Sequence, residues 1–116
     1  MNMISPLAYI HPEAKIGENV EIGPFVYIDK NVVIGDNTVM AAMTGIAGSA
    51  KIGRNCIIAG QVGIVGHITI PDNTTIAAQS GVISSIKEEG QVVMGSPAIP
   101  LKNYLRSYAV FKKQGQ

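Results

Sequence analysis

The stretch YIDKNVVIGDNTVMAAMTGIAGSAKIG, residues 27–53, places a large aliphatic residue at every sixth position. Stepping by six in both directions from Ile28 extends this series without a break from Ile4 to Val82, and every member is Ile, Val or Met. A small or β-branched residue stands four positions after each of them, from Ala8 to Ile86. Neither helical periodicity nor simple strand alternation produces a period of six, so the pattern indicates an internal repeat.

Hexads of this kind are typical of the parallel β-helix, in which three hexads form one triangular coil and the coils stack at the ~4.8 Å spacing of paired strands. Glycine opens several of the turns and is followed by Asp-Asn, Glu-Asn or Arg-Asn, which tolerate positive φ; examples are Gly17, Gly35 and Gly53. The repeat predicts an all-β fold of about four to five coils over residues 1–87.

The register breaks at Glu88, where polar residues replace the expected apolar one. Residues 88–99 are therefore expected to form an exit loop. From Pro100, which suits a first helical position, apolar residues recur at three- and four-residue steps: Leu101, Tyr104, Leu105, Tyr108 and Phe111. This spacing predicts an amphipathic α-helix over residues 100–114.

The composition of the chain argues against several classes of function. The chain has 116 residues, a net charge of +1 and no Trp, and this balance argues against a nucleic-acid binder that works by phosphate neutralisation. No apolar run reaches membrane-spanning length and the N-terminus lacks the features of a signal peptide. The single cysteine, Cys56, cannot form an internal disulfide and is expected to pack inward. We expect a soluble cytoplasmic protein with no membrane insertion.

The C-terminal segment is locally basic. No acidic residue follows Glu89, and the cations there are Lys102, Arg106, Lys112 and Lys113. Two interpretations stay open: a solvated helix face, or a docking surface for an acidic carrier protein.

Two resemblances emerge from longer motifs. Residues 3–39, MISPLAYIHPEAKIGENVEIGPFVYIDKNVVIGDNTV, resemble the start of the UDP-N-acetylglucosamine O-acyltransferases of lipid A biosynthesis. Residues 31–113 resemble the C-terminal half of the UDP-3-O-acylglucosamine N-acyltransferases of the same pathway, through GIAGSAKIGRNC, GQVGIVGHITI, AAQSGV and MGSPAIPLKNYLRSYAVFKK. The resemblance implies a left-handed coil, a homotrimer with sites between subunits, and 3-hydroxyacyl transfer from acyl carrier protein to a UDP-glucosamine derivative. The combination suggests a hybrid or engineered chimera.

The resemblance also implies that the catalytic general base of the family is absent from this chain. The N-acyltransferases carry Ala-His-Asn where this chain has Asp29, Lys30 and Asn31, and that His is their general base. A lysine at its ordinary pKa of about 10.4 is protonated at neutral pH and cannot accept a proton. The O-acyltransferase His lies beyond the resembling segment, and no segment corresponds to the uridine-gripping N-terminal domain. We therefore expect no intact catalytic residue, weak or absent turnover, and doubtful UDP-sugar binding.

Positions eighteen apart should stack on one face of the coil. His67 then lies between Ser49 and Ser85, with Asn31 two coils away. By resemblance His67 belongs to the acyl-donor groove; alternatively it is an exposed, hydrogen-bonded side chain. Asn31, Ser49, Gln61 and Gln79 are further groove candidates. His11 before Pro12 reads as a turn residue. Met43 replaces an expected Gln, either as a surface substitution or as a change to a groove wall.

The alternative function is a non-catalytic engineered trimeric scaffold. A third class, the metal-dependent hexapeptide enzymes, needs three His ligands, and the chain has two His. We therefore expect neither a metal nor a cofactor.

Overall fold

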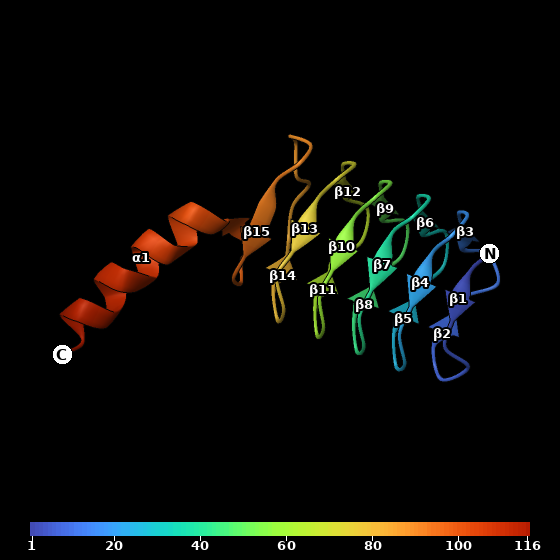
Figure 1. The fold of residues 1–116 in the computed structure, drawn as a ribbon, viewed down its shortest axis with the longest axis horizontal. Helices are drawn as coiled ribbons and strands as arrows, with labels where there is room; N and C mark the ends of the chain where they lie inside the picture. The colour runs from blue at the N-terminus through green and yellow to red at the C-terminus, as the bar shows by residue number, and fades with distance from the viewer.

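The computed structural model describes residues 1–116 as a left-handed parallel β-helix that ends in one α-helix (Figure 1). Two-residue strands recur every six residues and fall into three sheets. Sheet A contains β1 (Met3–Ile4), β4 (Glu21–Ile22), β7 (Val39–Met40), β10 (Ile57–Ile58) and β13 (Thr75–Ile76), followed by β15 (Val92–Met94) and β16 (Ile99–Pro100). Sheet B contains β2 (Tyr9–Ile10), β5 (Tyr27–Ile28), β8 (Gly45–Ile46), β11 (Gly63–Ile64) and β14 (Gly81–Val82). Sheet C contains β3 (Lys15–Ile16), β6 (Val33–Ile34), β9 (Lys51–Ile52) and β12 (Thr69–Ile70).

Each residue pairs with the residue one coil later. Tyr27 lies opposite Gly45 and Ile28 opposite Ile46, so the coil repeats every eighteen residues, as the hexads predicted. The second residue of each strand points inward and forms a continuous stack of buried aliphatic side chains. The first coil is less enclosed, since Ile10 and Ile16 are only half-buried and Ile4 is exposed.

The buried polar side chains donate hydrogen bonds to backbone carbonyls at the turns. Thr38 Oγ1 donates to the Gly53 carbonyl at 2.8 Å and Thr44 Oγ1 to that of Ala59 at 3.0 Å. No buried side-chain nitrogen or oxygen lacks a hydrogen-bond partner. The interior is therefore filled and fully bonded, so function has to be sought on the outer faces and corners.

Three corners join the sheets. The AB corner has tip residues Leu7, Phe25, Met43, Gln61 and Gln79; the BC corner has Glu13, Asn31, Ser49, His67 and Ser85; the CA corner has Asn19, Asn37, Asn55 and Asn73. Eleven of these tips, from Asn19 to Gln79, adopt positive φ, each three residues after an inward aliphatic residue, whereas Leu7, Glu13 and Ser85 do not. The Asn of the Glu-Asn, Asp-Asn and Arg-Asn pairs, at Asn19, Asn37 and Asn55, adopts positive φ as predicted, whereas the preceding turn glycines do not.

Two expectations about the exit segment need correction. Residues 88–99 are not a loop throughout, because β15 adds a further parallel strand to sheet A beside β13 and then pairs antiparallel with β16. Helix α1 spans Leu101–Gln114, and Pro100 is its N-cap rather than its first residue. The chain leaves the coil only after adding one more strand, because Val92 and Val93 still supply the outward and inward side chains that sheet A requires.

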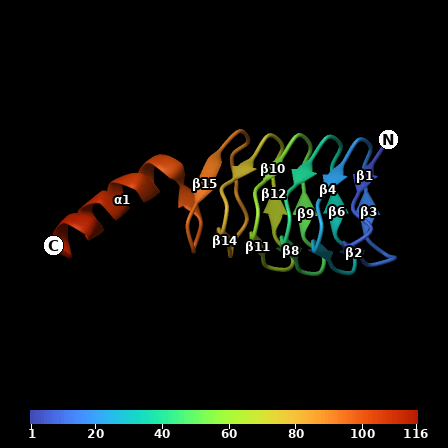
Figure 2. The same cartoon turned by 60° about the horizontal axis from the view of Figure 1, so that its bottom comes forward.

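Helix α1 projects beyond the last coil as an arm (Figures 1 and 2). It contacts β15 and β16 at its start, and none of its residues is fully buried. The structure contains no helix with the length and apolar character needed to span a membrane.

Candidate functional site

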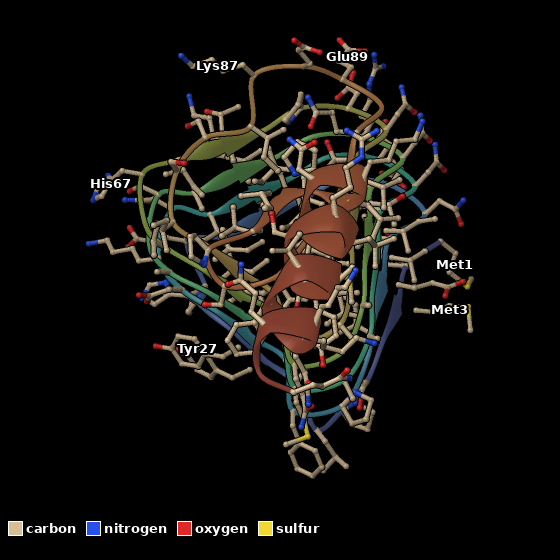
Figure 3. The ribbon with its side chains drawn as sticks, turned by 90° about the vertical axis from the view of Figure 1, so that its left-hand side faces the viewer. Met1, Met3, Tyr27, His67, Lys87 and Glu89 are labelled. Atoms are coloured by element: carbon tan, nitrogen blue, oxygen red, sulfur yellow. The ribbon has the colours of Figure 1, made fainter.

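The BC corner carries the histidine that the sequence singled out. The backbone N–H of Ser49 donates to the Lys30 carbonyl at 2.9 Å, and that of His67 donates to the Gly48 carbonyl at 3.1 Å. Asn31, Ser49 and His67 therefore stack on successive coils, and His67 points outward (Figure 3). His67 has a φ of 66°, in the left-handed region that few non-glycine residues adopt and in which Asn, Asp and His are enriched.

Lys30 lies on the same corner in an ion pair. Its Nζ is 3.4 Å from Glu13 Oε2, and both side chains are more than half exposed. The backbone N–H of Lys30 donates to Asp29 Oδ1 at 2.8 Å. An ammonium group engaged with a carboxylate offers donors and no lone pair. The geometry at this position provides an ion-paired cation.

The two glutamines are on the opposite border of sheet B. Gln79 Nε2 donates to Gln61 Oε1 at 2.9 Å, and Met43 occupies the rung before Gln61 at the same AB corner. The predicted groove residues thus form two separate ladders, one on each corner flanking sheet B. Met43 is an exposed part of the AB border.

An open trough lies between these two corners. It occupies about 490 Å³ on the outer face of sheet B, and its residues include Tyr27, Asp29, Gly45, Gly63, Val65 and Ile83. Its axis runs across the strands, because Tyr27, Gly45, Gly63 and Gly81 pair in sequence from coil to coil. None of the glycines is among the residues predicted from the sequence. Their spacing of eighteen, with Tyr9 and Tyr27 in the same column, is the signal that identifies them.

Gly45 and Gly63, here called the open glycines, are not required by the fold. A Cβ added to either would meet no atom within 4 Å, and neither has positive φ. The glycines that open the CA corner, Gly17, Gly35 and Gly53, are here called the packed glycines. A Cβ on Gly35 would lie 2.5 Å from the carbonyl carbon of Gly53. Of these two sets, only the packed glycines are explained by contacts within the chain.

One end of the trough is closed by the exit segment. Gly81 accepts a hydrogen bond from the backbone N–H of Ala98 and donates one to the Gly95 carbonyl, both at 2.9 Å. Ser96 covers the position where a Gly81 side chain would stand. At the other end, Tyr27 stacks on Tyr9 with ring centroids 5.2 Å apart. The carboxylate of Asp29 is the main cause that raises the pKa of Tyr27 above its usual range.

The remaining predicted residues lie apart from the trough. Lys102, Arg106, Lys112 and Lys113 are on helix α1 beyond the last coil, and Lys112 Nζ lies 5.3 Å from the centroid of the Tyr108 ring. His11 is a turn residue as predicted, because its Nδ1 accepts a hydrogen bond from the backbone N–H of Glu13 at 3.0 Å. Cys56 is fully buried, as predicted, and burial raises the pKa of its thiol. No group of three or more His, Cys, Asp or Glu side chains converges.

Residues 13–48 match the family described as bacterial transferase hexapeptide (six repeats). The matched segment includes Lys30, Asp29 and Gly45, so it overlaps the end of the trough nearest Tyr27. No curated protein matches the sequence significantly.

Solved structures extend the likeness over most of the chain. A serine acetyltransferase from Neisseria gonorrhoeae in complex with serine is 29% identical with a TM-score of 0.72, covering 79% of this chain and 41% of its own. The soybean serine acetyltransferase is 25% identical with a TM-score of 0.74, covering 79% of this chain and 42% of its own. A mutant GDP-perosamine N-acetyltransferase from Caulobacter crescentus shares the fold at 21% identity and a TM-score of 0.68, covering 85% and 55%. The chain spans roughly half or less of these proteins, all of which are acetyltransferases.

Proposed function

We propose that this chain is an acyltransferase module of the lipid A pathway, which takes a 3-hydroxyacyl group from acyl carrier protein and offers it to a UDP-glucosamine derivative, in the cytoplasm. The observation that carries the proposal is the open apolar trough beside His67 on a hexapeptide β-helix. The acetyltransferase structures with the same fold support the reaction class. The resemblance described above supports the substrates.

The trough suits the acyl chain of the donor. Its floor at Gly63 has no side chain, and its wall at Val65 and Ile83 is apolar and exposed. Burial of such a surface against a hydrocarbon chain is favourable by about 25 cal/mol per Å². We propose that His67, at the BC border of the same sheet, hydrogen-bonds a polar group of the donor.

Lys30 limits the chemistry. In acyl transfer to an amine, the nitrogen attacks the thioester carbonyl, a C–N bond forms, the C–S bond breaks and the amine must lose a proton. The ion-paired ammonium of Lys30 cannot take that proton. Loss of a general base lowers the rate by roughly 10²–10⁴-fold, so we propose that turnover is weak or absent.

The first test measures binding of acyl carrier protein that bears a 3-hydroxyacyl chain, followed by turnover in the native chain and in Lys30→His. Donor binding in both, with turnover only in Lys30→His, is the expected result. The matched control is Lys51→His, which places an imidazole on the outer face of sheet C. Absence of donor binding in both proteins would favour the alternative, a non-catalytic trimeric scaffold.

Assembly and origin complete the proposal. We propose a homotrimer, because the outer face of sheet A, away from the trough, exposes apolar side chains such as Val39, Ile57 and Val92 that a neighbouring coil could cover. Analytical ultracentrifugation tests this, and a monomer at micromolar concentration would contradict it. We also propose that the chain is a hybrid of two acyltransferases. A single genomic reading frame that encodes all 116 residues would contradict the hybrid origin.

A further inference from the structure

Helix α1 separates the charge of the molecule into two parts. The residues before Leu101 include five Lys or Arg and eight Asp or Glu, a net charge of −3, whereas the helix carries four cations and no acid, a net charge of +4. At 1.5 Å per residue the helix is about 21 Å long, and it projects away from the last coil (Figures 1 and 2). An acidic coil therefore presents one basic arm.

The apolar side of this arm continues past the contact that anchors its first turn. Tyr104 packs on the exit segment, since a Cβ on Gly95 would lie 2.6 Å from its ring. Beyond that contact, Leu105, Tyr108 and Phe111, here called the apolar stripe, are 51%, 45% and 72% exposed. Ring centroids are 6.0 Å apart for Tyr104 and Tyr108 and 6.3 Å apart for Tyr108 and Phe111. The apolar stripe is a continuous surface that the coil leaves open to a partner.

Three of the cations form a strip beside the apolar stripe. Lys102, Arg106 and Lys113 are separated by four and seven residues, which places them on one side of a helix with 3.6 residues per turn. Both ion pairs of the structure lie within the coil, so the charge of this strip is not compensated by the chain itself. Charge complementarity favours an anionic partner that can also cover apolar side chains.

Lys112 distinguishes an anionic membrane from an acidic protein as that partner. It lies on the apolar side of the arm, with its Nζ 5.3 Å from the centroid of the Tyr108 ring. A protein that covered the apolar stripe would bury this ammonium group at the core of the interface, where charged residues are depleted. At a membrane surface the stem of a lysine packs along apolar groups while its ammonium group reaches the headgroups. Tyrosine rings are enriched at the same depth, so the arm fits the membrane interface better.

We propose that helix α1 binds the surface of an anionic phospholipid bilayer. The helix lies in the plane of the headgroups, with Leu105, Tyr108 and Phe111 toward the acyl chains and the cations toward the lipid phosphates. Such binding is peripheral and reversible, as it is for other amphipathic helices with a basic polar face. The proposal goes beyond the acyl transfer proposed above and does not depend on it.

The test is co-sedimentation of the full chain with vesicles of phosphatidylcholine mixed with phosphatidylglycerol, and with vesicles of phosphatidylcholine alone. We expect binding to the anionic vesicles only, weakened by added salt because salt screens exposed charges. The double variant Lys112→Gln and Lys113→Gln should weaken binding about 25-fold, at roughly fivefold per cation. The matched control is Lys15→Gln with Lys51→Gln, which removes two exposed cations from sheet C and should leave binding unchanged.

A single fluorophore tests whether the apolar stripe enters the interface. The chain has no Trp, so Phe111→Trp introduces one. We expect its emission to shift to shorter wavelength with anionic vesicles and to be quenched by brominated acyl chains. Leu7→Trp, at the exposed tip of the AB corner, is the matched control and should show neither change. All of the substituted side chains are exposed, so we expect every variant to keep the fold, which circular dichroism verifies.

The proposal is overturned if the native chain does not bind anionic vesicles, if it binds neutral vesicles equally well, or if the sheet C variant loses as much binding as the helix variant. Equal quenching of the two tryptophan variants would also overturn it. So would a Phe111→Trp emission that shifts with protein concentration in the absence of vesicles, because a second copy would then cover the apolar stripe.

Binding of acyl carrier protein that depends on Lys112 and Lys113, without vesicle binding, would overturn the proposal by identifying the arm as a protein-docking surface. Acyl-donor binding and the Lys30→His turnover are measured without vesicles. Failure of membrane binding therefore leaves the acyltransferase proposal standing, and the reverse also holds.

Discussion

The packed glycines of the CA corner and the open glycines of sheet B look alike in the sequence and differ in the structure. Gly35 faces the backbone of Gly53 so closely that any side chain would collide with it. Gly45 and Gly63 face open space, in strands whose φ any residue can adopt. The first set is explained by packing within the chain. The open glycines lower the stability of their strands, and no contact within the chain requires them. We therefore assign them to ligand binding.

Gly35→Ala should produce the largest effect, because the new Cβ would press on backbone that cannot move aside. We expect the free energy of unfolding to fall by about 2–3 kcal/mol, measured by urea denaturation. Gly45→Ala, at an open glycine, serves as the control. If Gly35→Ala lowered the free energy of unfolding by less than a surface substitution does, the CA corner would be more loosely packed than its geometry indicates.

Gly45→Ala and Gly63→Ala should act in the opposite direction. Removing the backbone entropy of glycine from a strand stabilises it by about 0.5–1 kcal/mol, and neither methyl group meets a neighbour. The same denaturation series measures the gain. Destabilisation by either substitution would mean that something covers the trough in solution, and sedimentation would then identify a second copy.

A smaller contrast separates the tips of the BC and CA corners. His67 adopts φ 66° where the CA corner uses Asn at every such tip from Asn19 to Asn73. The short polar side chain of Asn can hydrogen-bond locally in this conformation. We expect His67→Asn to raise stability by about 0.5 kcal/mol and to weaken acyl-donor binding. The reciprocal change Asn55→His should lower stability by a similar amount; a neutral result in both would remove the argument that His67 is kept for function.

The smallest effect concerns the interior and is confined to alkaline pH. Burial raises the folded-state pKa of Cys56, so the folded chain keeps the thiol proton that the unfolded chain loses above about pH 8.5. Stability from this group is complete below that pH and is lost as pH rises through the folded-state pKa. Cys56→Val, a residue used at the equivalent position in other hexads, should flatten the decline in thermal stability above about pH 8.5. Parallel curves for the two proteins would contradict it, since they share all tyrosines.

The coil was predictable because its cause is local and repeated. The inward aliphatic positions from Ile22 to Val82 are buried where the period of six placed them. The same arithmetic stacked His67 above Ser49 correctly. The period of six did not predict β15, because a single strand shows no period. Val92 pairs with Thr75, so the step to this strand is seventeen residues instead of eighteen.

The trough was harder to predict, because its main signal is a side chain that is missing. The period of six identifies the inward residues and gives Gly45 and Gly63 no role. The two glycines stand out only when the outward residues eighteen apart are compared, because Tyr27 occupies the same column one coil earlier. Whether a glycine is needed depends on the distance to the next coil. That distance distinguishes Gly35 from Gly45 and cannot be obtained from residue order.

The eighteen-residue register has a further consequence for evolution and for design. Every coil presents the same three faces, so duplication or deletion of one coil would lengthen or shorten the trough by one rung of about 4.8 Å while its two borders keep their chemistry. Substrate size would then change in discrete increments, independently of the residues that perform the reaction. A protein built on such a coil can acquire selectivity for a longer substrate by recombination at any corner, without first passing through a poorly packed intermediate.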